Sequence, residues 1–378
     1  MAVPNQATDI NGEMLSEMRL PADWEPQAAI WLAWPHNHET WPGRFGPVPK
    51  FFGNLTRLIA EDTSVRILAH GEVARDAEKI LTALPANVDL VPIKTNDCWI
   101  RDYGPMFVEN RSTNKIEAVD WRYNAWGGKY PPWDDDDAVA KQICQHLAIQ
   151  CHRSEMCLEG GTLETDGDFR LMTFTDCVQT DSRNPNWSNE RIVQELYRRL
   201  GILETVWIDG GGIQGDDTDG HIDQLARFVD PENIVVASCS ETTDSNAPAL
   251  IANFRQFDLW ARQTEPIVQI HKLPIPPARY IKDVRVPESY CNFLRLGKTR
   301  MLVPTFGDSM SDDQALGILK ELCPDTEIIG IDCRDLVWGL GALHCASLNQ
   351  PASAEDGSCI EKAWRKPSRL SVVLQRDV

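Results

Sequence analysis

The sequence predicts an α/β fold with mixed strand pairing, and two observations carry this prediction. Short apolar segments rich in β-branched residues alternate with segments whose apolar residues recur with helical spacing. No long Pro-, Ser- or Gly-rich linker divides the 378 residues, of which 42% are hydrophobic. A chain of this length and composition can bury a large core, so we expect one domain over residues 1–351.

The strand-like segments are short and β-branched, and they lie at residues 64–68, 88–93, 116–121, 169–174, 205–208, 234–237, 267–273, 301–304 and 327–331. The helix-like segments fall between them, at residues 50–60, 73–84, 139–147, 189–200, 249–262 and 312–322. This alternation of strands and helices is typical of α/β proteins.

Local signals refine three boundaries. Ser311 and Gln314 have the spacing of a capping box, which predicts the start of the last helix. Asp166 followed by Gly167 predicts a hairpin turn between two strands. Beyond residue 351 the chain becomes polar and loses its pattern, so we expect residues 352–378 to be peripheral or disordered.

The charge balance excludes some classes of partner. A net charge of −19 argues against nucleic-acid binding, which needs a basic surface, and against adsorption to an anionic membrane. The same charge can attract a small cationic molecule, although a soluble protein kept dispersed by its charge explains it equally well. The sequence leaves a homo-oligomer open.

The cysteines and the start of the chain indicate a reduced, cytoplasmic protein. The 11 cysteines are odd in number and irregularly spaced, which does not suggest a disulfide framework. No Cys-x-x-Cys or His-x-x-x-His pair occurs, so we expect no structural zinc. The N-terminal segment lacks the pattern of a signal peptide, and no apolar run approaches the ~18 residues that span a bilayer.

The segment Gly-Leu-Gly-Ala-Leu-His-Cys at residues 339–345 is the most informative motif. Glycines before a cysteine allow backbone and ligand to approach it closely. A free cysteine is usually an inert core residue, but this setting favours Cys345 as a nucleophile. Neighbouring side chains in an extended segment point to opposite faces, so we expect His344 to form a structural hydrogen bond and not to act as the base.

His221 and Asp223 form a second candidate group. In an extended segment, residues two positions apart share one face, so both side chains can meet the same ligand. Gly220 before them permits a tight approach. The alternative is an ordinary surface pair, which the acidic run at residues 216–219 supports.

Two further carboxylates precede residues that permit tight turns, Asp102 before Tyr-Gly-Pro and Glu159 before Gly-Gly. Alone, either is more often a turn acid than a functional one, and Arg101 beside Asp102 offers an ordinary ion pair as the competing explanation. Most of the 13 tryptophans must belong to the core. Trp99 and Trp126 lie in loops with glycine or acidic residues, so we expect them to line a pocket and hold a cation against a ring.

Taken together, these motifs resemble agmatine deiminase and the bacterial-type peptidylarginine deiminase family around it, within the guanidino-group-modifying superfamily. The likeness runs from about residue 18 to residue 351. The motifs that carry the likeness lie at residues 21–26 (Pro-Ala-Asp-Trp-Glu-Pro), 31–35, 96–105, 124–128, 158–161, 183–185, 220–223 and 304–308. The nucleophile segment differs from the usual Gly-Gly-Gly-Asn-Ile-His-Cys of agmatine deiminases, which leaves the exact substrate open.

The resemblance implies the pentein fold, a five-bladed α/β propeller of ββαβ units with pseudo-fivefold symmetry and an active site in its central channel. It implies Cys345 as the nucleophile and His221 as the general acid and base. It also implies that Glu159 orients the histidine and that Asp102 and Asp223 bind the guanidinium.

The expected reaction is hydrolysis of agmatine to N-carbamoylputrescine and ammonia, a step toward putrescine in polyamine biosynthesis. Asp102 and Asp223 pair with the N–H groups of the cation, which lowers the pKa of Cys345. The thiolate attacks, and His221 protonates the departing ammonia and then activates water. No metal or organic cofactor is required.

Three competing functions keep part of this interpretation. A deiminase or amidinotransferase acts on arginine, peptidyl arginine or another guanidino compound; arginine needs a cation for its α-carboxylate, with Arg122, Lys129 and Arg183 as candidates. A non-catalytic guanidine-binding protein uses Cys345 only structurally. A cysteine amidase or protease explains poorly why so many carboxylates converge.

Overall fold

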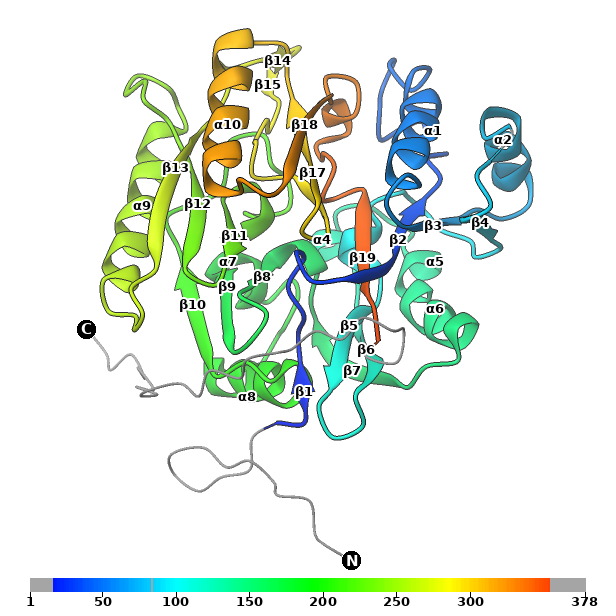
Figure 1. Cartoon of the computed structure of the whole chain (residues 1–378), viewed down its shortest axis with the longest axis horizontal. Coiled ribbons are helices and arrows are strands. Elements are labelled where there is room, and N and C mark those ends of the chain that lie inside the picture. The colour runs from blue at the N-terminus through cyan, green and yellow to red at the C-terminus, as the bar shows by residue number, and fades with distance from the viewer. Residues whose placement is uncertain (1–15, 83, 354–378) are drawn as a thin grey trace, which may run out of the picture.

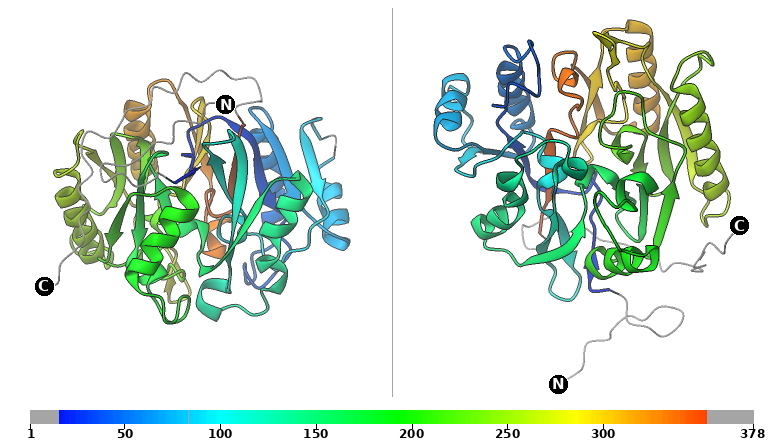
Figure 2. Two further views of the ribbon diagram at one scale, coloured as in Figure 1. Left: turned by 90° about the horizontal axis from the view of Figure 1, so that it is seen from below. Right: turned by 180° about the vertical axis from the view of Figure 1, so that it is seen from behind.

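The computed structural model describes residues 16–82 and 84–353. The longer helices lie at the periphery and the strands lie between them (Figure 1, Figure 2). Within these residues the strands form five sheets of three or four strands and one two-stranded ribbon, so the predicted α/β class is confirmed. Of the expected tail at residues 352–378, all but the first two residues lie outside the described part.

Four of the sheets repeat one plan, in which an antiparallel hairpin leads through a helix to a third strand that pairs parallel with the second. The elements of these four units, in order, are β5 (Met106–Asn110), β6 (Lys115–Arg122), α6 (Val139–Leu147) and β7 (Cys151–Cys157); β8 (Leu163–Thr165), β9 (Arg170–Phe174), α8 (Asn189–Leu200) and β10 (Glu204–Ile208); β11 (Ala226–Asp230), β12 (Asn233–Ser238), α9 (Ala247–Ala261) and β13 (Gln269–Pro274); and β16 (Leu294–Leu296), β17 (Arg300–Thr305), α10 (Ser309–Leu322) and β18 (Glu327–Asp332).

The fifth sheet is built from both ends of the described chain. The C-terminal β19 (Ser347–Pro351) pairs antiparallel with β2 (Gln27–Ala33), which places Leu348 opposite Trp31. β2 continues through α1 (Val48–Ile59) to the parallel β3 (Ser64–Leu68). This sheet therefore has the same plan as the others, with its hairpin supplied by two distant segments.

The remaining elements extend or connect these sheets. They are β1 (Met18–Arg19) on the edge of β5, α2 (Glu72–Ile80) and β4 (Val88–Val91) after β3, the ribbon of β14 (Tyr280–Ile281) and β15 (Val284–Arg285), and the short helices α3 (Ile100–Tyr103), α4 (Ala125–Gly128), α5 (Asp134–Asp137), α7 (Thr175–Val178), η1 (Gly160–Thr162), η2 (Ile222–Gln224) and η3 (Val337–Gly339).

The expected strands and helices are all present, and their ends shift by a few residues. The hairpin prediction is confirmed, because Asp166 Oδ1 accepts three backbone N–H groups between β8 and β9 and Gly167 has a φ of +79°. The capping-box prediction is wrong. α10 begins two residues before Ser311, because Asp308 is the N-cap and accepts from the Ser311 N–H at 2.9 Å.

The predicted strand ranges include none of the five strands that open the sheets, β5, β8, β11, β16 and β19, and only the hairpin turn at Asp166 and Gly167 indicated β8. β8, β11 and β16 each carry a buried charged residue, namely Glu164, Arg227 and Arg295. A charge inside a strand of three to five residues hides its apolar pattern. Two of these residues, Glu164 and Arg227, belong to an ionic network inside the molecule, next to the candidate site.

Candidate active site

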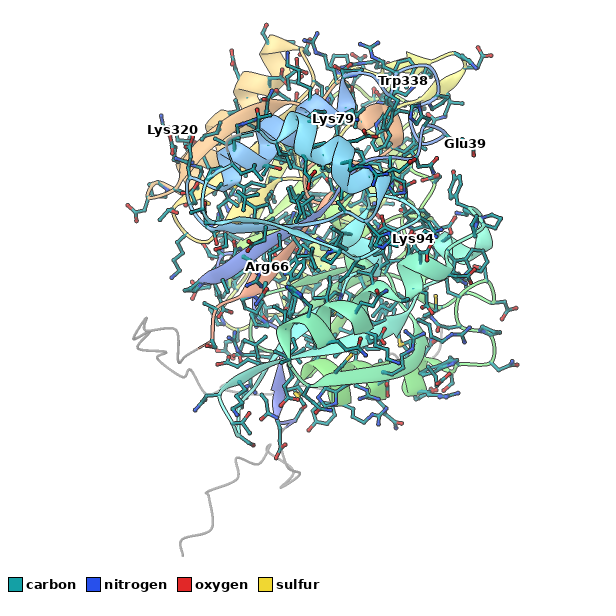
Figure 3. All side chains as sticks on the ribbon, turned by 90° about the vertical axis from the view of Figure 1, so that its right-hand side faces the viewer. Glu39, Arg66, Lys79, Lys94, Lys320 and Trp338 are labelled. Carbon is teal, nitrogen blue, oxygen red and sulfur yellow. The ribbon has the colours of Figure 1, made fainter. Side chains whose placement is uncertain are left out.

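A cavity of about 1280 Å³ has Cys345, His221 and Asp102 in its wall. Its lining includes Glu39 and Trp338, which Figure 3 labels on the same side of the molecule. A separate cavity of about 80 Å³ is lined by His344, the neighbour of Cys345 in the chain. The turn that carries these two residues therefore lies between two cavities.

The candidate residues occupy corresponding places in different sheets. Each belongs to the short segment that leads into the opening strand. Asp102 lies in α3 before β5, and Glu159 precedes η1 and β8. His221 and Asp223 lie at η2 before β11, and Cys345 precedes β19. This common position explains how side chains far apart in the sequence meet around one pocket.

Asp102 is buried and held by two N–H donors. The indole of Trp126 donates to Oδ2 at 3.0 Å, and the backbone N–H of Gly161 donates to Oδ1 at 3.0 Å. Burial raises the pKa of Asp102 to about 6, although the nearby His221 opposes this. The carboxylate is thus fixed in position, and a cation that reaches it would stabilise its ionised form.

His221 lies between two carboxylates. Its Nδ1 is 3.6 Å from Oδ1 of Asp102, and its Nε2 is 3.7 Å from Oε2 of Glu159. Neither ring nitrogen has a hydrogen-bond partner among the described residues. Burial tends to lower the pKa of His221, but Asp102 and Glu159 raise it to about 9. The imidazole is therefore protonated at neutral pH.

Glu159 is fully buried and does not line the cavity. Nε of Arg183 donates to both of its carboxylate oxygens, at 2.7 and 2.9 Å. Burial tends to raise the pKa of Glu159, but His221 and Arg183 together lower it below its ordinary value. Glu159 is therefore a fixed negative charge beside the imidazole.

Asp223 contacts the nucleophile from inside the protein. Its Oδ2 lies 3.5 Å from Sγ of Cys345 and 2.7 Å from Nδ1 of His344. Its Oδ1 is buried and has no hydrogen-bond partner in the described part of the chain. Burial tends to raise the pKa of Asp223, but the hydrogen bond with His344 brings it below the ordinary value.

Behind Asp223 lies a second group of charges, which we call the rear network, made up of Asp23, Arg101, Glu164, Arg227 and His344. Oδ2 of Asp23 is 3.0 Å from Nε2 of His344 and 2.8 Å from an NH2 donor of Arg227. Nε of Arg227 donates to Glu164 at 2.7 Å. Arg101 reaches within 4.0 Å of Asp23. The rear network therefore anchors His344, which in turn holds Asp223.

Cys345 is buried, with 7% of its surface exposed. Burial raises the pKa of its thiol well above the usual range, and Asp223 and Asp102 raise it further. One hydrogen bond reaches Sγ from a neutral donor, the amide Nδ2 of Asn292, at 3.1 Å. Without a bound cation the sulfur is therefore a protonated thiol at neutral pH.

Two glycines allow these groups to lie so close together. A Cβ on Gly161 would lie 2.5 Å from Nδ1 of His221 and 2.8 Å from Oδ1 of Asp102. A Cβ on Gly341 would lie 2.6 Å from the ring of Trp99. These positions need glycine for space, which accounts for the Gly-rich character of both motifs.

Trp99 and Trp126 both line the cavity, as do the three reactive groups. The Trp99 ring packs against Trp41 with 5.6 Å between ring centroids. Trp126 packs edge-on against Tyr123 and Tyr130 at the same wall. The two tryptophans thus shape the cavity, and one of them also fixes Asp102.

The structure corrects several local expectations. Residues 222–224 form the 3-10 helix η2 and are not extended, so the expectation that strand geometry puts His221 and Asp223 on one face is wrong: His221 lines the cavity and Asp223 does not. Residues 343–346 form a turn, closed by Ala346 N–H donating to Ala342 at 3.1 Å. His344 lines the smaller cavity and forms hydrogen bonds with Asp23 and Asp223, as expected, and it shares Oδ2 of Asp223 with Sγ of Cys345.

The contacts of the neighbouring cations settle their roles. Arg101 does not pair with Asp102, because it contacts Asp23 and Asn349 in place of its neighbour. Arg183 is bound to Glu159, and Arg122 is exposed outside the cavity lining. Of the three candidate cations for a substrate carboxylate, Lys129 lines the cavity.

Sequence reasoning missed Asn292 and the rear network. Asn292 is fully buried between Cys291 and Phe293, both of which are also buried. A single amide in an apolar run before a strand must find partners inside the protein, and this signal was present in the sequence. Its partner could not be read, because it lies in another part of the chain.

Comparison with known proteins places this chain among the hydrolases that act on C–N bonds of amidines. The family described as Porphyromonas-type peptidyl-arginine deiminase matches residues 19–351, and the chain belongs to this family. A curated relative from Photobacterium profundum, named "Putative agmatine deiminase", is 33% identical over 88% of this chain and 96% of its own.

Solved structures agree with this assignment. The agmatine deiminase of Enterococcus faecalis, described as catalyzing its reaction, is 28% identical, with a TM-score of 0.81 over 91% of this chain and 99% of its own. A cysteine-to-serine variant of the agmatine deiminase of C. jejuni with substrate bound is 26% identical, with a TM-score of 0.80 over 89% of this chain and 97% of its own. In the described residues of this chain, no helix is both long and apolar enough to cross a membrane.

Proposed function

We propose that this protein hydrolyses agmatine to N-carbamoylputrescine and ammonia through a covalent amidino-cysteine intermediate. One observation carries the proposal. The thiol of Cys345 lies among buried groups that lack hydrogen-bond partners in the described residues, namely Oδ1 of Asp223 and both ring nitrogens of His221. A planar cation with several N–H donors supplies the partner that Oδ1 of Asp223 lacks.

The proposed reaction starts with charge neutralisation. The guanidinium pairs with Asp102 and Asp223, the two carboxylates that raise the pKa of Cys345 in the free protein. Their charge is then compensated, so the thiol ionises more easily and its proton leaves to solvent. Substrate binding and activation of the nucleophile are therefore one event, and in the free protein the thiol is mostly protonated and reacts slowly.

The thiolate then attacks the guanidinium carbon and forms a C–S bond. The C–N bond to one terminal nitrogen breaks, and His221 gives that nitrogen a proton, so ammonia leaves. The neutral imidazole next takes a proton from water as the water adds to the same carbon. The C–S bond breaks with its electron pair on sulfur, and the proton of the new hydroxyl group passes to that sulfur. The ureido product then leaves, and Cys345 and His221 are again a thiol and a protonated imidazole. Glu159 keeps the imidazole in place and favours its protonated form.

The cavity wall favours agmatine over arginine. Lys129 pairs with Asp219 at 2.7 Å, and Arg285 pairs with Asp244, so neither is available for an α-carboxylate. Lys282 also lines the cavity, but it is exposed on the turn between β14 and β15, where solvent screens its charge. Beyond Asp102, the lining contains four more carboxylates, which suit a second positive charge: Glu39, Asp97, Asp136 and Asp217.

The family resemblance and the repeated sheets support the finer fold proposal. Five sheets share the same strand plan, and each sends a short segment toward the cavity. We therefore propose the five-bladed pentein propeller, formed by residues 1–351 as one catalytic domain. We also propose a cytoplasmic location and a role in polyamine biosynthesis. We propose no nucleic-acid or membrane partner, and the sequence is compatible with a homo-oligomer.

An ammonia-release panel tests the function. Agmatine, arginine, Nα-blocked arginine and short arginyl peptides are compared, and the organic product is identified by mass spectrometry. We expect agmatine to have the highest kcat/KM, with arginine at least ~100-fold lower, since burying an unpaired carboxylate among carboxylates costs several kcal/mol. A preference for arginine or its peptides would overturn the substrate assignment.

The same panel distinguishes a deiminase from an amidinotransferase and from a binding protein. With an added amine acceptor, an amidinotransferase would give a new guanidino product in place of the ureido product. A guanidine-binding protein would bind agmatine without releasing ammonia. Trapping of the intermediate by acid quench, read as a mass increase on the peptide that contains Cys345, distinguishes covalent catalysis from simple binding.

A further inference from the structure

Asn292 contacts the sulfur of the nucleophile, and the proposed mechanism gives it no role. It lies before β16, in the segment that leads into the opening strand of its sheet. Asp102, Glu159, Asp223 and Cys345 occupy the corresponding segments of the other four sheets. Every sheet of the repeated plan therefore sends a polar side chain to the same centre, and Asn292 is the contribution of the fourth hairpin unit.

The hydrogen bonds of Asn292 fix the direction of its amide group. Its Oδ1 accepts the backbone N–H groups of His344 at 3.1 Å and of Cys345 at 3.3 Å. A flipped amide would point an NH2 group at these two donors, so the flip is excluded. With the oxygen committed, Nδ2 is the atom that faces Sγ of Cys345, at 3.1 Å.

The surroundings keep this geometry rigid. The side chain is fully buried. Its own backbone carbonyl accepts a second contact from the His344 N–H at 3.1 Å. Ser289, three residues earlier, donates through its hydroxyl to the backbone of Gln224 at 2.6 Å, which ties this segment to η2. The amide donor is thus held in position before any substrate arrives.

We propose that Asn292 is a further catalytic residue, whose amide N–H stabilises the thiolate of Cys345. This inference rests on the proposed function, because it assigns the hydrogen bond to the same nucleophile. An N–H donor binds an anionic sulfur more strongly than a neutral thiol or a thioether sulfur. It therefore favours the thiolate before attack and again when the C–S bond of the intermediate breaks and sulfur leaves with the electron pair.

The electrostatics show why a neutral donor is needed here. Burial and the carboxylates of Asp223 and Asp102 raise the pKa of the thiol, while the hydrogen bonds from the backbone of Ala342 and from the side chain of Asn292 act in the opposite direction. A fixed cation at this place would compete with the cationic substrate for both carboxylates. A neutral amide lowers the cost of the thiolate and leaves those carboxylates to the guanidinium.

Three variants separate a catalytic role from an anchoring role. Asn292→Ala removes the amide donor and the anchoring oxygen, and Asn292→Asp keeps the oxygen but places a carboxylate beside Sγ. Ser289→Ala is the anchoring control, because it frees the same segment from η2 and leaves the donor in place. If Asn292 only anchors the turn, Ser289→Ala slows alkylation as much as Asn292→Ala does. If the donor matters, Ser289→Ala stays close to the parent and both Asn292 variants are slower.

The readout is the rate at which neutral iodoacetamide alkylates Cys345 in the full-length protein without substrate, located by peptide mass spectrometry between pH 7 and 10. We expect the Asn292→Ala variant to react about 10–100-fold more slowly at each pH, as for the loss of a charge-assisted hydrogen bond. The Asn292→Asp variant is slower still. Agmatine turnover is measured in parallel, and kcat should fall by a similar factor with a smaller change in KM.

Thermal unfolding of each variant shows that the comparison is made on folded protein, and the isosteric Asp variant serves if the Ala variant is unstable. Parental alkylation rates in Asn292→Asp would overturn the inference. The parent protein failing to release ammonia from any guanidine would overturn the proposed function alone, because the alkylation test needs no substrate.

Discussion

Two buried groups of charges lie side by side in this protein, and their partners differ. In the rear network, Arg227 is fully buried and its donors meet Asp23, Glu164 and two backbone carbonyls. Around the nucleophile, both nitrogens of His221 and Oδ1 of Asp223 are equally buried and have no hydrogen-bond partner among the described residues. The two groups are equally buried, but Arg227 has hydrogen-bond partners for its donors, whereas the His221 ring and Oδ1 of Asp223 have none in the described part of the chain.

The pKa values of Asp23 and Asp102 differ in the same sense, although neither group is uniform: burial raises the pKa of Glu164 in the rear network to about 7, and the pKa of Asp223 beside the nucleophile lies below its ordinary value. Burial tends to raise the pKa of Asp23, yet Arg101 and His344 hold it well below its ordinary range. Burial raises the pKa of Asp102 to about 6, because His221 compensates only part of the cost of burying its charge. Buried charges that the protein satisfies itself support the fold, whereas those left unsatisfied mark the place where a charged ligand completes the set.

The largest effect is expected at the centre of the unsatisfied group. Cys345→Ser should lower agmatine hydrolysis by roughly 10⁴-fold or more, because a buried hydroxyl is a far weaker nucleophile than a thiolate. Circular dichroism should show an unchanged fold, since a serine hydroxyl can keep the contacts of the thiol with Asn292 and Asp223. Near-parental turnover in this variant would remove the covalent mechanism.

Asp223→Asn should separate binding from nucleophile ionisation. The amide oxygen can keep the His344 contact while the NH2 group takes the place of the unpartnered Oδ1. We expect kcat/KM for agmatine to fall by the equivalent of about 3–5 kcal/mol, as for a broken buried charge pair. Alkylation of the free thiol by iodoacetamide should become faster, because one of the carboxylates that raise the pKa of Cys345 is gone.

Those two changes run in opposite directions, which makes the test strict. A variant in which both activity and alkylation fall would indicate a distorted site. A variant in which neither changes would show that Asp223 contacts neither the guanidinium nor the sulfur in solution.

Glu164→Gln should lower stability and leave catalysis nearly unchanged, because Glu164 belongs to the rear network and not to the groups around the nucleophile. It weakens the contact with Arg227 and sets an NH2 group against the N–H of Arg227 or of Phe228. We expect the free energy of unfolding in urea to fall by about 3 kcal/mol, with little change in kcat/KM of the folded fraction. A full loss of activity without loss of stability would contradict the division between the two groups.

The smallest effect concerns pH. Asp102 must be ionised to pair with the cation, so kcat/KM should fall as the pH drops below about 6. His221 must be protonated to release ammonia, so kcat, measured with saturating agmatine when the bound cation has already favoured the thiolate of Cys345, should fall above about pH 9. In Glu159→Gln the histidine loses one of the charges that raise its pKa, and the alkaline limb should move to lower pH. A limb that stays in place would show that another group controls it.

How much of this structure could be predicted from the sequence depended on the kind of signal. Regular helices such as α6 and α8, and strands such as β3, follow from local periodicity, and their predicted bounds match. The glycine-flanked motifs of Cys345 and Glu159 indicated candidate site residues, because close packing leaves a mark in composition. These are properties that neighbouring residues encode together.

Pairings across the chain could not be predicted in this way. β8, β11 and β16 were missed because Glu164, Arg227 and Arg295 interrupt short apolar patterns, and the reason for those charges lies in distant partners. The contact of Asn292 with Cys345 joins residues of different sheets. Both depend on tertiary structure, which no local pattern contains.

The pairing of β19 with β2 has a consequence for how the protein becomes active. The nucleophile stands two residues before a strand whose hydrogen-bonding partner was synthesised more than 300 residues earlier. A chain that ends before residue 347 would lack β19. β2 would then be an unpaired sheet edge, and the segment that carries Cys345 would not be fixed beside it. We therefore expect catalysis only after β19 has paired with β2, and incomplete chains made during synthesis to be inactive.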